Sequence, residues 1–529
     1  MKKKITFLDT TLRDGTQASG IMLNADDKIK VARALDRFGF DYIEGGWPGS
    51  NETDELFFRK LRNGGGLKYA VLTAFGSTRR KGHSARNDPN LRAIAAAKVK
   101  AACIFGKSWD LHVTHALRVT LEDNLKMISE SLRYLKGRGI KVIYDAEHFF
   151  DGFKANRKYA LSTLRAAADA GVVYLTLCDT NGGTLPDEIR SIVRAVKSSL
   201  QKSGVKTELG IHTHNDTGCA VAGSIYGVME GCAHVQGTIN GWGERCGNAN
   251  LSSVIPNLQL KMGLKCFADE KLETLTELTR YVDEVANRVP GEHQPYVGSS
   301  AFAHKGGIHV SAMSRHSSTY EHIDPRKVGN ERRILISELA GKSNITAKVR
   351  ELRLDFAKSR ESTTKIIKLV KKLEHEGYQF EDAKGSFALT VRRAFKKYRS
   401  FFDLGGFRVI VERDPVKGGM RSEATIKVFV DGREEHTASE GDGPVNALDN
   451  ALRKALDRFY PELKEVSLSD FKVRVINARG GTASRVRVII TSRDKKDTWG
   501  TIGVSENIIE ASWQALVDAI EYKLLKTRG

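Results

Sequence analysis

Cysteine is scarce in this sequence, with six residues among 529 and no CxxC pair. This excludes a disulfide-stabilised secreted scaffold, and we expect the six thiols to be reduced. No apolar run approaches the roughly 18 residues that a membrane span requires. The basic N-terminus "MKKK" leads into a strand-like segment without the apolar core of a signal peptide. We therefore expect a cytoplasmic protein with no membrane partner.

Negative charge is in deficit, since 84 lysines and arginines face 64 acidic residues and the net charge is +20. Such a balance is compatible with nucleic-acid binding. However, the basic residues are mixed with acids along helix-like segments, and neither a long basic run nor a zinc-finger pattern occurs. We therefore expect no nucleic-acid partner. A basic surface also attracts small anions such as CoA esters and oxoacids.

Residues 1–260 alternate strand-like and helix-like segments, and we expect a catalytic domain over residues 1–270. The strand candidates are ITFLDTTLRD (5–14), FDYIEGG (40–46), YAVLTAFGS (69–77), AACIFGKS (101–108), KVIYDAEHF (141–149), VVYLTLCDT (172–180), TELGIHTHND (207–216) and HVQGTINGWGERCGN (234–248). Between the first two, Asn24 predicts the start of a helix and Gly39 its end. Eight strand–helix units in about 260 residues predict a TIM barrel, with a doubly wound open sheet as the alternative.

The stretch HTHND (212–216) places His212 and His214 on one face of a strand. This spacing suits two metal ligands, although two hydrogen-bonded or surface histidines would show it too. A barrel gathers polar residues at the C-terminal ends of its strands, which would bring Asp14 and Asn248 close. Two imidazoles with a carboxylate and an amide oxygen predict a divalent cation, namely Mn²⁺, Mg²⁺, Zn²⁺ or Co²⁺.

Residues 271–400 are expected to form helical linker or lid subdomains, and residues 401–529 a separate α+β domain. The latter contains a weak repeat at an offset of 61 residues, between segments that begin at Thr437 and Thr498. Each segment holds a helix that follows a β-rich stretch, so we expect a duplicated β–β–α unit. A duplicated unit after the catalytic region indicates regulation or dimerisation. The alternative is a chance similarity between two amphipathic helices.

Four motifs carry a resemblance to a known family. They are LDTTLRDGTQ (8–17), HTHNDTGCAVA (212–222), NGWGERCGNANL (240–251) and HKGGIHVSA (304–312). In this order they closely resemble the 2-isopropylmalate, homocitrate and citramalate synthase family, over nearly the whole chain. The resemblance implies an acyltransferase that condenses the methyl carbon of acetyl-CoA with a 2-oxoacid and then hydrolyses the thioester. It also implies a C-terminal domain that senses leucine or isoleucine.

The resemblance further implies which residues bind the metal and the oxoacid. The metal ligands would be Asp14, His212 and His214, with Asn248 near the metal. Arg13 would stabilise the oxygen of the oxoacid, and Thr180 would bind its carboxylate.

Proton transfer is implied for residues from two regions of the chain. Glu147 would be the catalytic glutamate, and His309 would help it to deprotonate acetyl-CoA. Tyr320 would come from the same segment as His309. His304 is the rival to His309, with a contact to CoA or a structural role in the loop as its alternatives.

Four further strings resemble the citramalate synthase subgroup, which makes (R)-citramalate from pyruvate on the way to isoleucine. They are EGGWPGSN (44–51), TAFGSTRRKG (73–82), CIFGKSWDLHV (103–113) and YDAEHFFDGF (144–153). Asp145 stands where many 2-isopropylmalate synthases have serine, and Phe105 is bulky. Both favour a small oxoacid, and Asp145 is expected to contact it.

We therefore expect pyruvate as the acceptor, isoleucine as the effector and a homodimer. The alternatives are a 2-isopropylmalate synthase that uses 2-oxoisovalerate and an acyl-CoA lyase such as the hydroxymethylglutaryl-CoA lyases. The lyases are shorter and lack a region like residues 401–529. A non-enzymatic amino-acid sensor would show no CoA release with any oxoacid.

Overall fold

The computed structural model describes residues 4–335, 342–413, 419–476 and 484–528. These residues form two compact units. The first contains residues 1–302 and 323–331, and the second contains residues 303–322 and 332–529. The predicted division at residues 270 and 400 stays a prediction. All six cysteines are free thiols, as expected. Among the described helices, none combines the length and the apolar character needed to cross a membrane.

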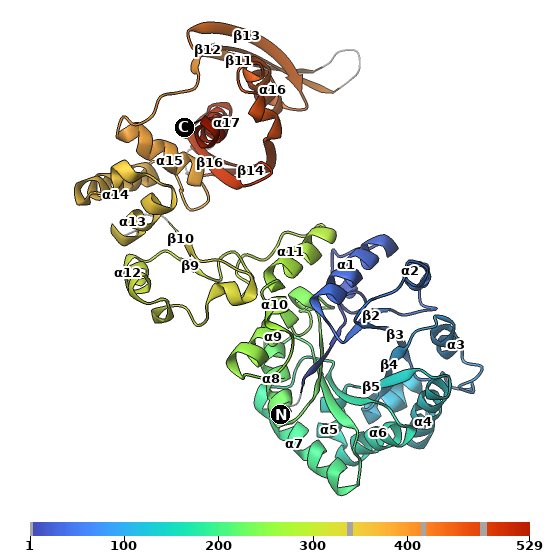
Figure 1. Cartoon of the computed structure of the whole chain (residues 1–529). Helices are drawn as coiled ribbons and strands as arrows, with labels where there is room; N and C mark the ends of the chain where they lie inside the picture. The colour runs from blue at the N-terminus through green and yellow to red at the C-terminus, as the bar shows by residue number, and fades with distance from the viewer. Residues whose placement is uncertain (1–3, 336–341, 414–418, 477–483, 529) are drawn as a thin grey trace. The chain divides into compact units, whose positions relative to one another are not determined.

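The first unit is built on a closed barrel of eight parallel strands (Figure 1). The strands are β1 (Thr6–Asp9), β2 (Tyr42–Gly46), β3 (Val71–Ser77), β4 (Ala101–Lys107), β5 (Lys141–Glu147), β6 (Tyr174–Asp179), β7 (Glu208–Thr213) and β8 (His234–Gly237). Strand β1 pairs with both β2 and β8, so the sheet has no edge. The predicted TIM barrel is therefore confirmed, and the open sheet was the wrong alternative.

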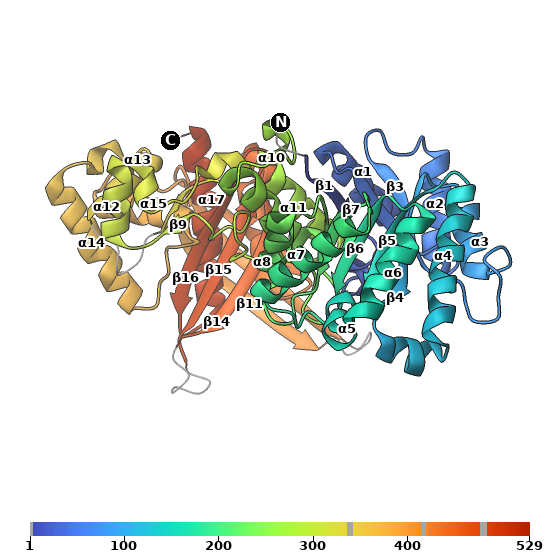
Figure 2. The same ribbon diagram turned by 90° about the horizontal axis from the view of Figure 1, so that it is seen from below.

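Helices surround these strands in both views of the molecule (Figures 1 and 2). They are α1 (Ala25–Phe38), α2 (Glu52–Asn63), α3 (Pro89–Ala96), α4 (Leu121–Gly137), α5 (Phe149–Ala155), α6 (Arg157–Ala170), α7 (Pro186–Lys202) and α8 (Ala220–Glu230), followed by α9 (Leu251–Pro256), α10 (Asp269–Leu272) and α11 (Leu275–Val285). Helix α1 has the predicted ends. The side chain of Asn24 accepts hydrogen bonds from two backbone N–H groups, and Gly39 ends the helix with a φ of 110°.

The second unit begins with two short paired strands, β9 (Ala303–His304) and β10 (Arg333–Ile334), and helix α12 (Gly307–Arg315). Helices α13 (Lys342–Glu351), α14 (Arg360–His375) and α15 (Lys384–Ala394) follow. Phe387 on α15 packs in one core with Ile502 and Val504. These helices therefore share their core with the last sheet of the chain, which contains Ile502 and Val504.

The C-terminal residues fold as two similar halves. The first half is β11 (Asp403–Arg413), β12 (Met420–Val430), β13 (Arg433–Gly441) and α16 (Pro444–Leu456). The second half is β14 (Ser467–Val475), β15 (Val486–Arg493), β16 (Thr498–Ser505) and α17 (Ile508–Arg528). Each three-stranded sheet packs against its own helix, and α17 also contributes to the core of the first half.

The internal repeat is therefore real, but two details of its prediction were wrong. Each half is β–β–β–α, one strand longer than expected, and its elements start 64 to 66 residues after their counterparts rather than 61. The first strand of each half, β11 or β14, was missed because it is an exposed edge strand. An exposed strand lacks the clear alternation of apolar and polar residues by which a half-buried strand is predicted.

Candidate active site

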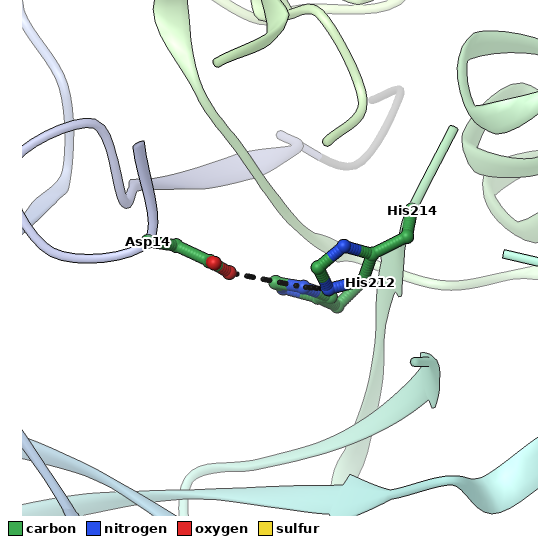
Figure 3. A group of neighbouring side chains, drawn as sticks. All are labelled: Asp14, His212 and His214. Atoms are coloured by element: carbon green, nitrogen blue, oxygen red, sulfur yellow. Dashed lines mark hydrogen bonds and ion pairs between the residues drawn. The ribbon is translucent and has the colours of Figure 1, made fainter. Parts of the chain in front are cut away.

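Three buried side chains meet at the C-terminal ends of β1 and β7 (Figure 3). Nε2 of His212 lies 3.2 Å from Nε2 of His214 and 3.5 Å from Oδ2 of Asp14. One ligand atom from each residue lies within 4.8 Å of the others. His212 and His214 are brought together by the two-residue period of the strand. Asp14 reaches them because β8 lies between β7 and β1 in the closed barrel.

This group fits a divalent cation. Nδ1 of His212 lies 2.9 Å from Oε1 of Gln236, so a proton on Nδ1 leaves the lone pair of Nε2 directed towards Asp14 and His214. The amide of Asn248 donates to Oδ2 of Asp14 at 2.8 Å. The amide oxygen of Asn248 is buried and has no hydrogen-bond partner among the described residues. Imidazole nitrogens combined with oxygen donors suit borderline and hard divalent metals.

The charges of the group also suit a cation. Burial favours the neutral form of Asp14, but Arg13 and the two imidazoles outweigh it and hold the pKa of Asp14 at about 2. Burial and the neighbouring His212 lower the pKa of His214 to about 3. Near neutral pH the site therefore contains a carboxylate anion and a neutral His214 ring, the protonation states that metal binding requires.

Arg13 is held in place beside this group. Its Nε donates to Oε2 of Glu44 at 2.6 Å, and its Nη2 lies 3.6 Å from Oδ2 of Asp14. Its guanidinium carbon lies 3.6 Å from the ring centroid of Phe75. Glu44 is fully buried, and burial raises its pKa to about 7 although Arg13 acts against the rise. A planar cation with these contacts has little freedom to turn, so its remaining N–H groups have a defined direction.

The predicted residues Glu147 and Thr180 stand at neighbouring strand ends. Glu147 ends β5 and forms an ion pair with Lys107, the last residue of β4, with 2.5 Å between Oε2 and Nζ. The hydroxyl of Thr180, just after β6, accepts a hydrogen bond from the backbone N–H of His148 at 2.9 Å. Both side chains are half-buried. The sequence reasoning missed Lys107, although a lysine at the end of an apolar strand is a usable signal.

Aromatic rings form an apolar wall beside Arg13. Phe105, predicted to narrow the pocket, stacks on Phe75 with 5.3 Å between ring centroids. Trp47 meets both rings edge-on, at 5.5 Å from Phe75 and 5.7 Å from Phe105. This wall restricts the room next to the guanidinium.

Asp145 has a different environment from that of a pocket residue. It is 4% exposed, and its two oxygens accept hydrogen bonds from Nε2 of Gln236 at 2.8 Å and from Sγ of Cys103 at 3.0 Å. Gln236 was missed by the sequence reasoning. The signal that could have found it is its place in strand β8, the neighbour of the strand that carries His212.

The remaining predicted residues lie in the second unit. His309 on α12 stacks on Tyr320 with 4.0 Å between the ring centroids, and both are exposed. Nε2 of His304 lies 3.3 Å from Oε1 of Glu321, which is also paired with Arg332. His304 therefore lies beside the ion pair of Glu321 and Arg332, whereas His309 and Tyr320 form an exposed aromatic pair.

Three family models match consecutive parts of the chain. Residues 4–283 match the HMGL-like family model, residues 296–378 the homocitrate synthase post-HMGL domain-like model, and residues 383–524 the LeuA allosteric (dimerisation) domain. Among solved structures, a hydroxymethylglutaryl-CoA lyase from Pseudomonas aeruginosa aligns at 18% identity with a TM-score of 0.45. That alignment covers 55% of this chain and 96% of the lyase.

Curated relatives match over their full length. The (R)-citramalate synthase of Geobacter sulfurreducens is 54% identical over 523 residues, which are 99% of this chain and 98% of that protein. The (R)-citramalate synthase of Aquifex aeolicus is 51% identical over 526 residues, 99% of each chain. The chain therefore belongs to the HMGL-like family and, within it, to the (R)-citramalate synthases.

Proposed function

We propose that this protein condenses acetyl-CoA with pyruvate and water to give (R)-citramalate and CoA. The observation that carries the proposal is the buried group of Asp14, His212 and His214 beside Arg13, in a chain that matches (R)-citramalate synthases over 99% of its length. The match of residues 383–524 to the LeuA domain argues against an acyl-CoA lyase. The product would enter the synthesis of isoleucine.

The proposed metal site consists of Asp14, His212 and His214, with the free amide oxygen of Asn248 as a further donor. We assign it to Mn²⁺ or Mg²⁺, with Zn²⁺ or Co²⁺ as alternatives. The bound cation supplies Lewis acidity to the keto group of the oxoacid.

Arg13 and Thr180 bind the oxoacid in this proposal. Arg13, fixed by Glu44 and Phe75, stabilises the negative charge that develops on the keto oxygen. The hydroxyl of Thr180 donates to the carboxylate of the oxoacid while it accepts from the N–H of His148.

Glu147 is the proposed base that removes a proton from the acetyl methyl group. Its ion pair with Lys107 fixes the carboxylate at the end of β5. His309 and Tyr320, an exposed stacked pair, are the further residues that we propose for acid–base chemistry. The resulting enolate carbon bonds to the keto carbon. Water then cleaves the thioester, which releases CoA and leaves the second carboxylate of the product.

Pyruvate is expected to be the preferred acceptor. The aromatic wall of Trp47, Phe75 and Phe105 favours a methyl group over the isopropyl group of 2-oxoisovalerate. One methylene in a pocket is worth about 1–3 kcal/mol, or roughly 10- to 200-fold. We expect kcat/KM for pyruvate to exceed that for 2-oxoisovalerate by about 10²-fold or more. A panel of 2-oxoacids assayed for CoA release measures this ratio and tests the proposed function.

The variant Phe105→Ala removes one ring of the wall but leaves in place Phe75, the ring against which Arg13 lies. It should therefore lower the ratio of kcat/KM for pyruvate to kcat/KM for larger oxoacids. The matched control is Phe267→Ala, which removes a ring that packs against Phe7, Phe38 and Phe40 instead of the wall, and it should leave the ratio of the two kcat/KM values native. A clear preference of the native protein for 2-oxoisovalerate would assign it to leucine synthesis instead.

Isoleucine is the proposed effector, and a homodimer is the proposed assembly. Both rest on the match of residues 383–524 to an allosteric and dimerisation domain. An allosteric coupling is typically about 1–3 kcal/mol, which corresponds to a 5- to 150-fold change in affinity. We expect isoleucine to inhibit more strongly than leucine or valine when each is titrated into the CoA-release assay. Stronger inhibition by leucine would refute isoleucine as the effector.

A further inference from the structure

A chain of hydrogen bonds crosses the inside of the barrel beneath the candidate metal site. Nδ1 of His212 on β7 lies 2.9 Å from Oε1 of Gln236 on β8. Nε2 of Gln236 donates to Oδ1 of Asp145 on β5 at 2.8 Å, and Sγ of Cys103 on β4 donates to Oδ2 of Asp145 at 3.0 Å. All four side chains are buried. Side chains from four strands are thereby connected to one face of the metal site.

With a carboxylate at Asp145, the donors and acceptors in this series of hydrogen bonds allow only one orientation of the Gln236 amide. A carboxylate accepts hydrogen bonds and does not donate them, so Asp145 requires the NH₂ end of the Gln236 amide. The oxygen end of Gln236 must then face His212. An oxygen there requires a proton on Nδ1 of His212, and the neutral ring keeps its lone pair on Nε2. That nitrogen is the one that lies 3.5 Å from Asp14 and 3.2 Å from His214.

The other oxygen of Asp145 is occupied as well. Burial, followed by the charge of Asp145, raises the pKa of the Cys103 thiol well above its usual value. The thiol therefore keeps its proton and donates a hydrogen bond to Oδ2 of Asp145. With both oxygens bonded to interior groups and 4% of the residue exposed, Asp145 has little capacity left for a substrate.

We propose that Asp145 is a positioning residue for the metal site, which sets the orientation of the Gln236 amide and, through it, the tautomer of His212. This inference rests on the metal site of the proposed function but not on the identity of the oxoacid. It replaces the expectation that Asp145 binds the substrate. Partners that orient metal-binding histidines typically change metal affinity by 10- to 100-fold when they are mutated.

Asp145→Asn tests the inference, because the amide keeps the shape of the side chain but presents either an oxygen or an NH₂ group to Gln236. The Gln236 amide is then free to turn its NH₂ towards His212, which favours a proton on Nε2. We expect the affinity for Mn²⁺, measured by titration of the metal-free full-length protein with electron paramagnetic resonance, to fall about 10- to 100-fold. With Mn²⁺ saturating, KM for pyruvate should stay near the native value.

Two further variants separate positioning from a general loss of structure. Gln236→Leu should weaken Mn²⁺ binding similarly, and adding Asp145→Asn to it should cause little further loss, because Asp145 acts through Gln236. Thr176→Val is the matched control. The Thr176 hydroxyl also contacts Nε2 of Gln236, at 3.1 Å, but a hydroxyl both donates and accepts and so does not set the amide orientation. Its Mn²⁺ affinity should stay within about 3-fold of native, well inside the 10- to 100-fold expected of an orienting partner.

Two results would overturn the inference. If Asp145→Asn binds Mn²⁺ with native affinity and instead raises KM for pyruvate, Asp145 is a substrate contact and the proposed function stands. If the native protein binds no Mn²⁺, Mg²⁺, Zn²⁺ or Co²⁺, the metal site itself is refuted together with this inference. Thermal unfolding of each variant, measured without metal, shows whether the barrel has remained folded.

Discussion

Replacing His214 by alanine is expected to lower kcat/KM for pyruvate by about 10³-fold or more and to abolish Mn²⁺ binding. A Lewis acid contributes several kcal/mol to transition-state stabilisation, and about 1.4 kcal/mol corresponds to a factor of ten. His214 supplies one of the three ligand atoms that converge at the ends of β1 and β7. The checks are steady-state CoA release over a range of Mn²⁺ concentrations and direct metal titration.

The matched control for this variant is His83→Ala, which removes an exposed imidazole from a loop outside the site. It should keep native turnover and native Mn²⁺ affinity. The native protein should lose activity when a chelator is added and regain it with excess Mn²⁺. Full activity in the presence of chelator would refute the metal site.

Glu147→Gln is expected to slow the exchange of the acetyl methyl protons of acetyl-CoA with solvent by about 10²- to 10⁴-fold, the usual contribution of a general base. The amide keeps the size of the side chain but does not accept a proton at neutral pH. Because both side chains of the ion pair with Lys107 are only about one-fifth exposed, loss of the carboxylate charge should also lower stability, and thermal unfolding measures that cost separately. Nuclear magnetic resonance in deuterated water measures the exchange directly.

Glu130→Gln provides the same change of charge at another ion pair. Glu130 pairs with Arg79 at 2.6 Å and lies outside the candidate site. The Glu130→Gln variant should exchange the acetyl methyl protons at the native rate. Unchanged exchange in Glu147→Gln would mean that another group is the base, and His309→Asn and then His304→Asn would be tested next.

Local chemistry was enough to predict the barrel and its first helix. The eight strands lie in short strand-like stretches that alternate with helix-like segments, and the first helix carries its own start and stop signals, Asn24 and Gly39. The same reasoning failed at β11 and β14. Their side chains are mostly exposed, so apolar and polar residues do not alternate clearly in those two stretches.

The pairing of His212 with His214 was also determined by the sequence, because side chains two residues apart on a strand point to the same face. The chain order alone does not bring Asp14 to them across about 200 residues. That contact exists because β1 pairs with β8 and β8 with β7, which closes the barrel. The resemblance to known synthases supplied the same set of residues, but not their distances.

The environment of Asp145 was decided by the tertiary structure alone. The sequence shows an aspartate two residues before Glu147, which suggested a side chain at the pocket. In the fold, the register of four strands places Gln236 and Cys103 against its two oxygens. Strand period determines which side chains face the barrel interior. Which of them meet there depends on the stagger between strands that close the barrel, a long-range property that no local segment encodes.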